Sequence, residues 1–177
     1  MSLYWFPDNT VLCNFAAVSK LSLLEAVLRG RGRWVEAIEA EAAASARVYP
    51  DLAGIVRAGW LGDPIEITAL ADVEQVERVR RAVFGGSPKE PLKHLGEAQT
   101  CFVILNRQEF DGSYWITDDR EAQEYARAQG IITRDTMDLV SEAVVEGSCS
   151  RDEGFKLLHQ MVEFGNHLRV PEHPWHL

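Results

Sequence analysis

The sequence has little basic charge. Its 177 residues contain 18 lysines and arginines against 27 aspartates and glutamates, which gives a formal net charge of −9. Proteins that bind nucleic acid normally present a basic surface, because contacts to phosphates supply much of the affinity. A chain this acidic therefore needs bound cations, a local basic patch or a basic partner before it can hold a polyanion.

Cysteines and long apolar runs are also scarce. Cys13, Cys101 and Cys149 are odd in number and widely spaced, which argues against a disulfide framework or a CxxC metal site and favours buried free thiols. No apolar run approaches the roughly 20 residues of a membrane helix. The N-terminus lacks the basic start of a secretory signal, so we expect a cytoplasmic protein without membrane contact.

Several common catalytic patterns are missing. No glycine lies between Asp8 and Phe15, which argues against a Rossmann-type nucleotide site. Thr10 stands where phosphotransfer enzymes of the HAD type carry a second acid, and a receiver domain would need an early acidic pair and a late lysine. We see no serine elbow for a Ser/His/Asp site. The histidines are isolated and are interpreted as ordinary helix or tail residues: His94, His159, His167, His173 and His176.

The pattern that is present alternates strands with helices. Residues 3–6 are four bulky apolar residues, which predicts a strand buried on both faces, as in parallel sheets. Further strands are expected at 34–35, 65–70, 114–117 and 131–133. Helices are expected at 11–16, 21–28, 36–47, 51–60, 73–83, 92–105, 120–129, 137–146 and 152–164. This alternation predicts an α/β domain with a mostly parallel sheet, spanning 1–170 and followed by an irregular tail at 171–177.

Three acids follow predicted strands. Asp8 comes directly after the first strand, and Asp118 and Asp119 end the strand at 114–117. In open α/β sheets, ligands gather at the carboxyl ends of the strands. We therefore expect Asp118 or Asp119 to reach the same edge as Asp8, while the other could cap the helix that begins at Arg120.

Two further acids lie on helix faces that are expected to be buried. Glu41 follows Ala37 and Ile38 by four and three positions, which places it on the apolar stripe of its helix. Glu97 is the only charged residue between Lys93 and Arg107. Glu41 could instead pair with an arginine at the helix edge, and Glu97 could simply favour the positive end of its helix dipole.

Taken together, these acids predict a cation site. Clustered carboxylates repel one another unless a positive charge lies among them. Hard oxygen ligands without matching histidines or cysteines favour Mg²⁺ or Mn²⁺. The expected set is Asp8, Glu41, Glu97, Asp118 and Asp119.

The motifs around these acids resemble the PIN-domain family, the metal-dependent ribonuclease fold of VapC-like toxins. Residues 8–12 resemble the family's opening Asp-x-Thr/Ser-x-Leu, and residues 34–41 resemble its "vPeaVleE". Residues 94–98 are similar to a subgroup's "lGEae", and residues 116–120 to "l-T/D-D-D-r". The likeness covers nearly the whole chain, with an insertion at 48–61.

The resemblance implies a single-domain, three-layer α/β/α fold with a mostly parallel central sheet. It also implies a Mg²⁺- or Mn²⁺-dependent endoribonuclease that hydrolyses RNA phosphodiesters, as the toxin component of a toxin–antitoxin pair. RNA would be the substrate and an antitoxin the protein partner. The implied metal ligands are Asp8, Glu97 and Asp118 or Asp119, with help from Glu41. The hydroxyls of Thr10 and Thr117 would orient the carboxylates.

A second hypothesis is a PIN-like protein-interaction module with metal affinity but weak catalysis, which the acidic composition also suits. Three arginines, at 29, 31 and 33, could contact phosphates or form a solvated loop. The apolar face of the last helix, over residues 155–162, could pack on the core or against a second copy in a homodimer. The RNA target and the identity of an antitoxin are left open.

Overall fold

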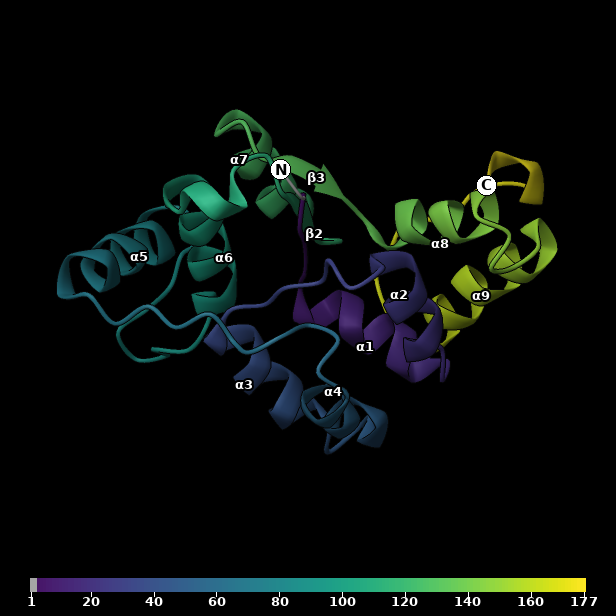
Figure 1. Cartoon of the computed structure of the whole chain (residues 1–177), viewed down its shortest axis with the longest axis horizontal. Coiled ribbons are helices and arrows are strands. Elements are labelled where there is room, and N and C mark those ends of the chain that lie inside the picture. The colour runs from purple at the N-terminus through teal and green to yellow at the C-terminus, as the bar shows by residue number, and fades with distance from the viewer. Residues whose placement is uncertain (1–2) are drawn as a thin grey trace.

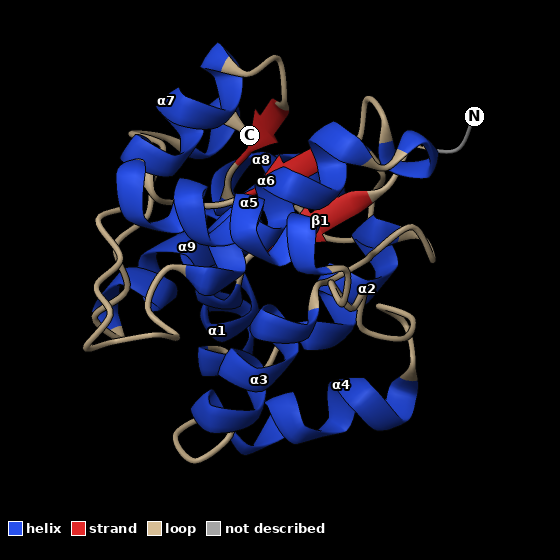
Figure 2. Ribbon diagram, turned by 90° about the vertical axis from the view of Figure 1, so that its left-hand side faces the viewer, coloured by secondary structure: helices blue, strands red, loops and turns tan. Residues whose placement is uncertain are grey.

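The computed structural model describes residues 3–177 and shows a mixed α/β protein in which short strands lie among helices (Figures 1 and 2). Strands β1 (Trp5–Pro7), β2 (Tyr114–Ile116) and β3 (Ile132–Arg134) form a parallel sheet in the order β1-β2-β3. The predicted parallel sheet and these three strand positions are therefore confirmed.

The strands expected at 34–35 and 65–70 are reduced to isolated bridges. Trp5 pairs with Gly32 and Val35 pairs with Ile65, both in parallel. Beyond Ile65, the backbone N–H of Ile67 donates to a side-chain oxygen of Glu36 at 3.4 Å. The prediction of a full strand at 65–70 was wrong, because this side-chain contact takes the place of a strand neighbour.

The helices follow the predicted ones closely, with ends that differ by a few residues. They are α1 (Asn9–Ala17), α2 (Leu21–Leu28), α3 (Glu36–Ser45), α4 (Ala53–Ala58), α5 (Leu70–Ala82), α6 (Leu95–Asn106), α7 (Arg120–Ala128), α8 (Thr136–Val145) and α9 (Arg151–Glu163). The helix expected at 51–60 is split into the 3₁₀ turn η1 (Pro50–Leu52) and α4. A second 3₁₀ turn, η2 (Gln108–Phe110), follows α6.

Local capping explains where several helices begin. Asp119, Asp135 and Ser150 accept backbone N–H bonds at the starts of α7, α8 and α9. Such caps satisfy amides that have no partner inside the helix. Helix α6 begins at Leu95 rather than at 92, because His94 has the left-handed φ of 62°.

Helices lie on both sides of the strands. Figure 1 shows α5 and α6 on one side and α2, α8 and α9 on the other, with α3 and α4 below. Phe6 and Trp115 are among the most buried side chains of the core. In α5 and at its C-terminal end, Val76 is buried but Val73 and Val83 are 43% and 40% exposed.

The C-terminal tail is more ordered than expected. It forms the 3₁₀ turn η3 (Pro174–His176), which packs on α9, and Leu177 is buried. Leu158 and Met161 of α9 are fully buried within this chain, so much of that face packs on the core. Cys101 is buried, and Cys13 and Cys149 are partly exposed free thiols. None of the helices formed by residues 3–177 is long and apolar enough to cross a bilayer.

Candidate metal centre

Asp8 lies at the junction between β1 and α1. Its backbone N–H donates to the carbonyl of Ile116 at 2.8 Å, which holds it against the end of β2. Its Oδ1 accepts the N–H of Asn9 at 2.8 Å, and its Oδ2 accepts the hydroxyls of Thr10 at 3.0 Å and Thr117 at 3.3 Å. The two threonines therefore orient this carboxylate, as predicted.

Asp8 is only 6% exposed. Burial, and after it the negative charge of Glu97, raise the pKa of Asp8 from 3.8 to about 7. The three hydrogen bonds favour the charged form but do not offset these effects. Asp8 is thus a carboxyl that exchanges its proton near neutral pH.

Glu41 projects from α3 toward the start of α6. Burial, and then the charges of Asp8 and Glu97, raise the pKa of Glu41 from 4.5 to about 8, against a backbone hydrogen bond from Gly96. The arginine pairing considered as the alternative is not formed among residues 3–177. Glu41 is thus a partly buried acid on the side of α3 that faces α6, and its role in a metal site stays a prediction.

Gly96 allows α3 and α6 to approach each other. A Cβ atom at this position would lie 2.4 Å from Cδ1 of Ile38 and 3.0 Å from Oε1 of Glu41. Real side chains do not tolerate the first distance, so any larger residue must displace Ile38 or the helix. The glycine before Glu97 therefore sets the position of Glu41 as well.

We expect Gly96→Ala to destabilise the protein by about 1–3 kcal/mol through overpacking and to weaken Mn²⁺ binding by displacing Glu41. Urea denaturation and calorimetric Mn²⁺ titration would measure the two effects. Gly54→Ala in α4 is the matched control, because its Cβ would meet nothing within 4 Å and alanine favours a helix. Equal behaviour of the two variants would contradict the role given to Gly96.

Glu97 lies in the first turn of α6 and contacts a histidine. Its Oε1 is 3.0 Å from Nδ1 of His94, and both side chains are partly buried. The interpretation of His94 as an ordinary helix residue was therefore wrong. Its left-handed backbone turns the chain into α6 and brings the imidazole against the acid.

The structure separates Asp118 from Asp119. Asp119 is exposed, and its Oδ1 accepts the N–H of Ala122 at 3.0 Å as the cap of α7. Asp118 accepts the backbone N–H of Thr136 at 3.0 Å, the hydroxyl of Thr136 at 2.6 Å and the amide of Asn14 at 2.8 Å. Burial raises the pKa of Asp118 to about 6 despite these bonds. Asp119 thus takes the capping role and Asp118 faces the interior.

Asp118 and residues from the first turns of α1 line the same cavity, which has a volume of about 360 Å³. Its lining is Asn9, Thr10, Cys13, Asn14, Asp118, Asp119, Gly165, Asn166 and His167. A second cavity of about 800 Å³ shares Asp118, Asn166 and His167 with the first. Arg169, which also lines the second cavity, is bound to Asp135 at 2.8 Å and to Asp138 at 2.7 Å.

Four residues of the site were not recognised in the sequence. They are Asn14, His94, Gly96 and Thr136. Asn14 lies four residues after Thr10 on a helix that is otherwise largely apolar, so its spacing could have identified it. The other three depend on contacts between segments far apart in the chain.

The carboxylate oxygens of the site suit a hard divalent cation, but they are not close enough together to hold one. Among residues 3–177, no group of three or more histidines, cysteines, aspartates or glutamates is arranged to hold a metal ion. The charge of Glu97 nevertheless raises the pKa of both Asp8 and Glu41, and the charge of Asp8 raises the pKa of Glu41. Their oxygens are the ligand type that Mg²⁺ and Mn²⁺ prefer, and they would need to move together to bind one directly.

Comparison with protein-family models, with curated proteins and with solved structures finds no match for this chain. What the site can do is therefore inferred from its own residues and from the short motifs that surround them.

Proposed function

We propose that this protein is a divalent-metal-dependent endoribonuclease that hydrolyses RNA phosphodiester bonds. The observation that carries the proposal is the gathering of Asp8, Glu41 and Glu97 from β1–α1, α3 and α6. Burial and mutual repulsion raise the pKa of the first two carboxyls, and no lysine or arginine is paired with any of the three in residues 3–177. A bound dication would relieve this repulsion.

The fold supports a PIN-like, three-layer arrangement as part of this proposal. Such a domain would usually contain more strands than three. The parallel bridges of Trp5 with Gly32 and of Val35 with Ile65 lie where two further strands would extend the sheet beyond β1. Helices on both sides of the strands in Figure 1 agree with the outer layers.

The chain's own residues would orient the reacting groups and move protons. Thr10 and Thr117 hold the Asp8 carboxylate in one orientation. A pKa near 7 for Asp8 and near 8 for Glu41 suits general acid–base work at neutral pH. A bound Mg²⁺ or Mn²⁺ would supply an activated water and neutralise charge that develops on the phosphate.

The toxin role and its antitoxin partner belong to the same proposal. An antitoxin with a basic segment would complement a chain of net charge −9. The alternative is a PIN-like interaction module with weak catalysis. The lack of a preformed set of metal ligands among residues 3–177 favours this second candidate.

The deciding experiment is RNA cleavage in Mn²⁺ and in EDTA. We expect the wild type to cleave only with Mn²⁺, and Asp8→Asn to be slower by roughly 10²–10³-fold, the size of losing one preorganised electrostatic contact. Asp63→Asn is the matched control, because Asp63 is exposed and its replacement should change nothing. Negligible cleavage by wild type and Asp8→Asn alike would reject the nuclease and favour the interaction module.

A further inference from the structure

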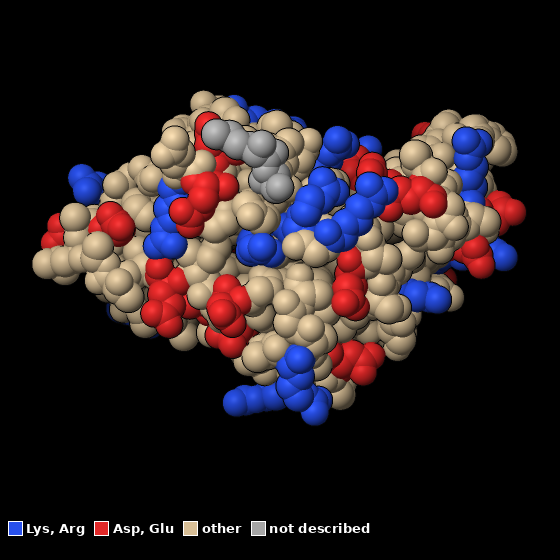
Figure 3. Space-filling view, viewed as in Figure 1, with Lys and Arg blue, Asp and Glu red and all other residues tan. Residues whose placement is uncertain are grey.

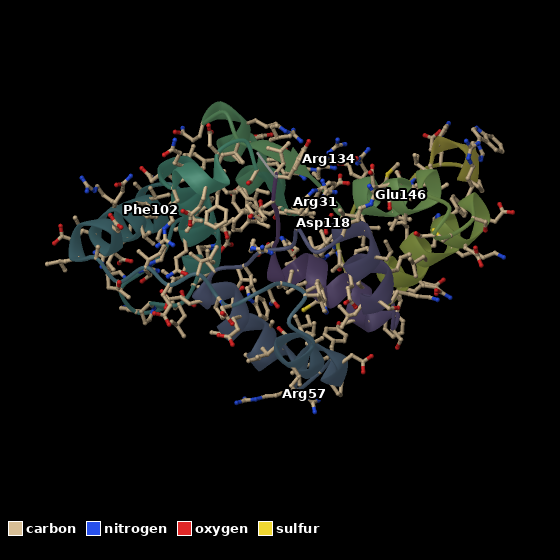
Figure 4. All side chains as sticks on the ribbon, in the orientation of Figure 1. Arg31, Arg57, Phe102, Asp118, Arg134 and Glu146 are labelled. Carbon is tan, nitrogen blue, oxygen red and sulfur yellow. The ribbon has the colours of Figure 1, made fainter. Side chains whose placement is uncertain are left out.

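Arginines gather on one face of this acidic protein. Figure 3 shows a cluster of basic side chains just above the middle of the face viewed, with acidic side chains beside it. Figure 4, in the same orientation, labels two arginines of this region, Arg31 and Arg134, and Arg33 follows Arg31 by two residues. The guanidinium of each of the three lies over an aromatic ring. We call these three residues the arginine patch.

The patch is built on aromatic side chains of the sheet. The guanidinium carbon of Arg31 lies 5.3 Å from the centre of the Trp5 ring, and that of Arg134 lies 5.7 Å from the Tyr114 ring. The two rings are 4.9 Å apart. Two arginines separated by about a hundred residues of sequence therefore share one aromatic support, and Figure 4 shows them close together.

The same sheet face is open beside these arginines. Trp5, Tyr114 and Ile132 are in register across β1, β2 and β3, so their side chains point to one face. Parallel sheets normally have both faces covered, yet Ile132 is 46% exposed. Trp5 is only 6% exposed and Tyr114 is partly buried, so the open apolar surface of this face lies at Ile132 on the edge strand β3, near Arg134.

The arginines of the patch have no carboxylate partner in the part of the chain that the structure describes. None of the ion pairs formed by residues 3–177 includes Arg31, Arg33 or Arg134. Arg29, by contrast, is paired with Glu146 at the margin of the patch. In a chain with nine more acids than bases, three grouped arginines without carboxylate partners indicate an external anion.

We propose that the arginine patch binds the backbone phosphates of single-stranded RNA. Guanidinium groups stacked on rings, as in Arg31 and Arg134, keep their N–H edges available for bidentate contact with a phosphate. Arg33 contributes its charge, but its guanidinium also donates to the carbonyls of Gly30 and Gly32. Ile132 and the exposed edge of Tyr114 provide a surface against which bases pack. The choice of RNA among polyanions rests on the proposed function.

The patch also lies at a useful separation from the carboxylates. Trp5 is at the amino end of β1 and Asp8 follows its carboxyl end. Three residues of extended chain span about 10 Å, and stacked nucleotides rise about 3.4 Å each. A strand held at the patch would therefore place a bond only a few nucleotides away near Asp8.

The test is binding of a fluorescein-labelled 12-nucleotide oligouridylate, followed by anisotropy in EDTA over a series of salt concentrations. We expect the double variant Arg31→Gln/Arg134→Gln to lose two phosphate contacts. The slope of log affinity against log salt should then fall by about 1.4, at about 0.7 per contact on a single strand. Arg57→Gln is the matched control, because Arg57 is exposed and lies far from the patch in Figure 4.

A second variant separates loss of charge from loss of folding. Arg31→Lys/Arg134→Lys keeps both charges and should retain the wild-type salt slope. The inference is overturned if the glutamine variant binds like wild type, or if Arg57→Gln weakens binding equally. It is also overturned if polyglutamate of equal charge displaces the RNA as well as unlabelled RNA does, since the patch would then serve an acidic protein.

The outcome is independent of catalysis, because EDTA prevents metal-dependent cleavage. Binding that needs the patch, together with no cleavage in Mn²⁺, would reject the nuclease and retain the patch. Normal cleavage and normal RNA binding by the glutamine variant would reject the patch alone.

Discussion

Replacing Asp8 with asparagine is expected to stabilise the metal-free protein at pH 9 and to leave its stability at pH 4 nearly unchanged. The pKa of Asp8 is about 7 in the folded protein, against a usual 3.8. The folded state therefore holds a proton that the unfolded chain releases between these values, and stability falls as pH rises through that window. Asparagine has the same shape and no charge to desolvate.

The size of this effect is bounded by the change in pKa. At about 1.36 kcal/mol per pH unit, the rise from 3.8 to about 7 corresponds to at most about 4 kcal/mol above pH 7. Urea denaturation of both proteins from pH 4 to pH 9 would measure it. If the free energy of unfolding changes with pH in the same way in wild type and Asp8→Asn, ionisation of Asp8 does not destabilise the folded protein. The control Asp63→Asn should follow the wild type at every pH.

Mn²⁺ should remove much of the same penalty in the wild type. A ligand that binds only the folded state adds about 2.7 kcal/mol at a hundred times its Kd. Because protons compete for the carboxylates, the gain should be larger at pH 8 than at pH 5. Asp8→Asn should gain much less, and an equal gain in both proteins would place the ion elsewhere.

Arg80→Ala is expected to destabilise the protein by about 1–3 kcal/mol, the usual cost of leaving buried acceptors without their donor. Arg80 is 1% exposed. It donates to both carboxylate oxygens of Glu77, at 2.6 and 2.9 Å, and to the carbonyls of Ser87, Glu90 and Lys93 at 3.0–3.3 Å. Alanine would leave those carbonyls without this donor.

The neighbouring Arg81 provides a control for Arg80. Its side chain is 52% exposed and pairs with the same Glu77, so Arg81→Ala should cost no more than about 1 kcal/mol. The free energy of unfolding in urea would be compared for the two variants. Similar losses would mean that the segment from Gly85 to His94 does not depend on Arg80. That segment leads into α6, so a real loss should also disturb Glu97.

The parts of the fold that sequence could predict are those set by neighbouring residues. The apolar run before Asp8 gives β1, and the residues of α2 are those expected from spacing alone. The helix predicted at 73–83 forms, but its buried residues include Arg80, which an apolar pattern does not identify. The strand predicted at 65–70 does not form, since among residues 3–177 the pairing ends at Ile65.

The candidate site shows the same limit. Helical spacing predicted that Glu41 is on the inner side of its helix, and the end of a strand predicted the position of Asp8. Strand ends alone could not separate Asp118 from Asp119, which differ only through their hydrogen bonds in the folded chain. Spacing could not show that Asn14 bonds Asp118 across 104 positions, or that Gly96 is the contact point of two helices. These features exist only once distant segments are packed together.

Arg169 attaches the segment that follows α9 to the rest of the protein. Its guanidinium joins that segment to Asp135 and Asp138 at the start of α8, next to the place where Asn166 and His167 line both cavities. The segment is thus held to the start of α8 by Arg169, and Asp118 lines the same two cavities. We expect that loss of the Arg169 contacts would widen the access to Asp118.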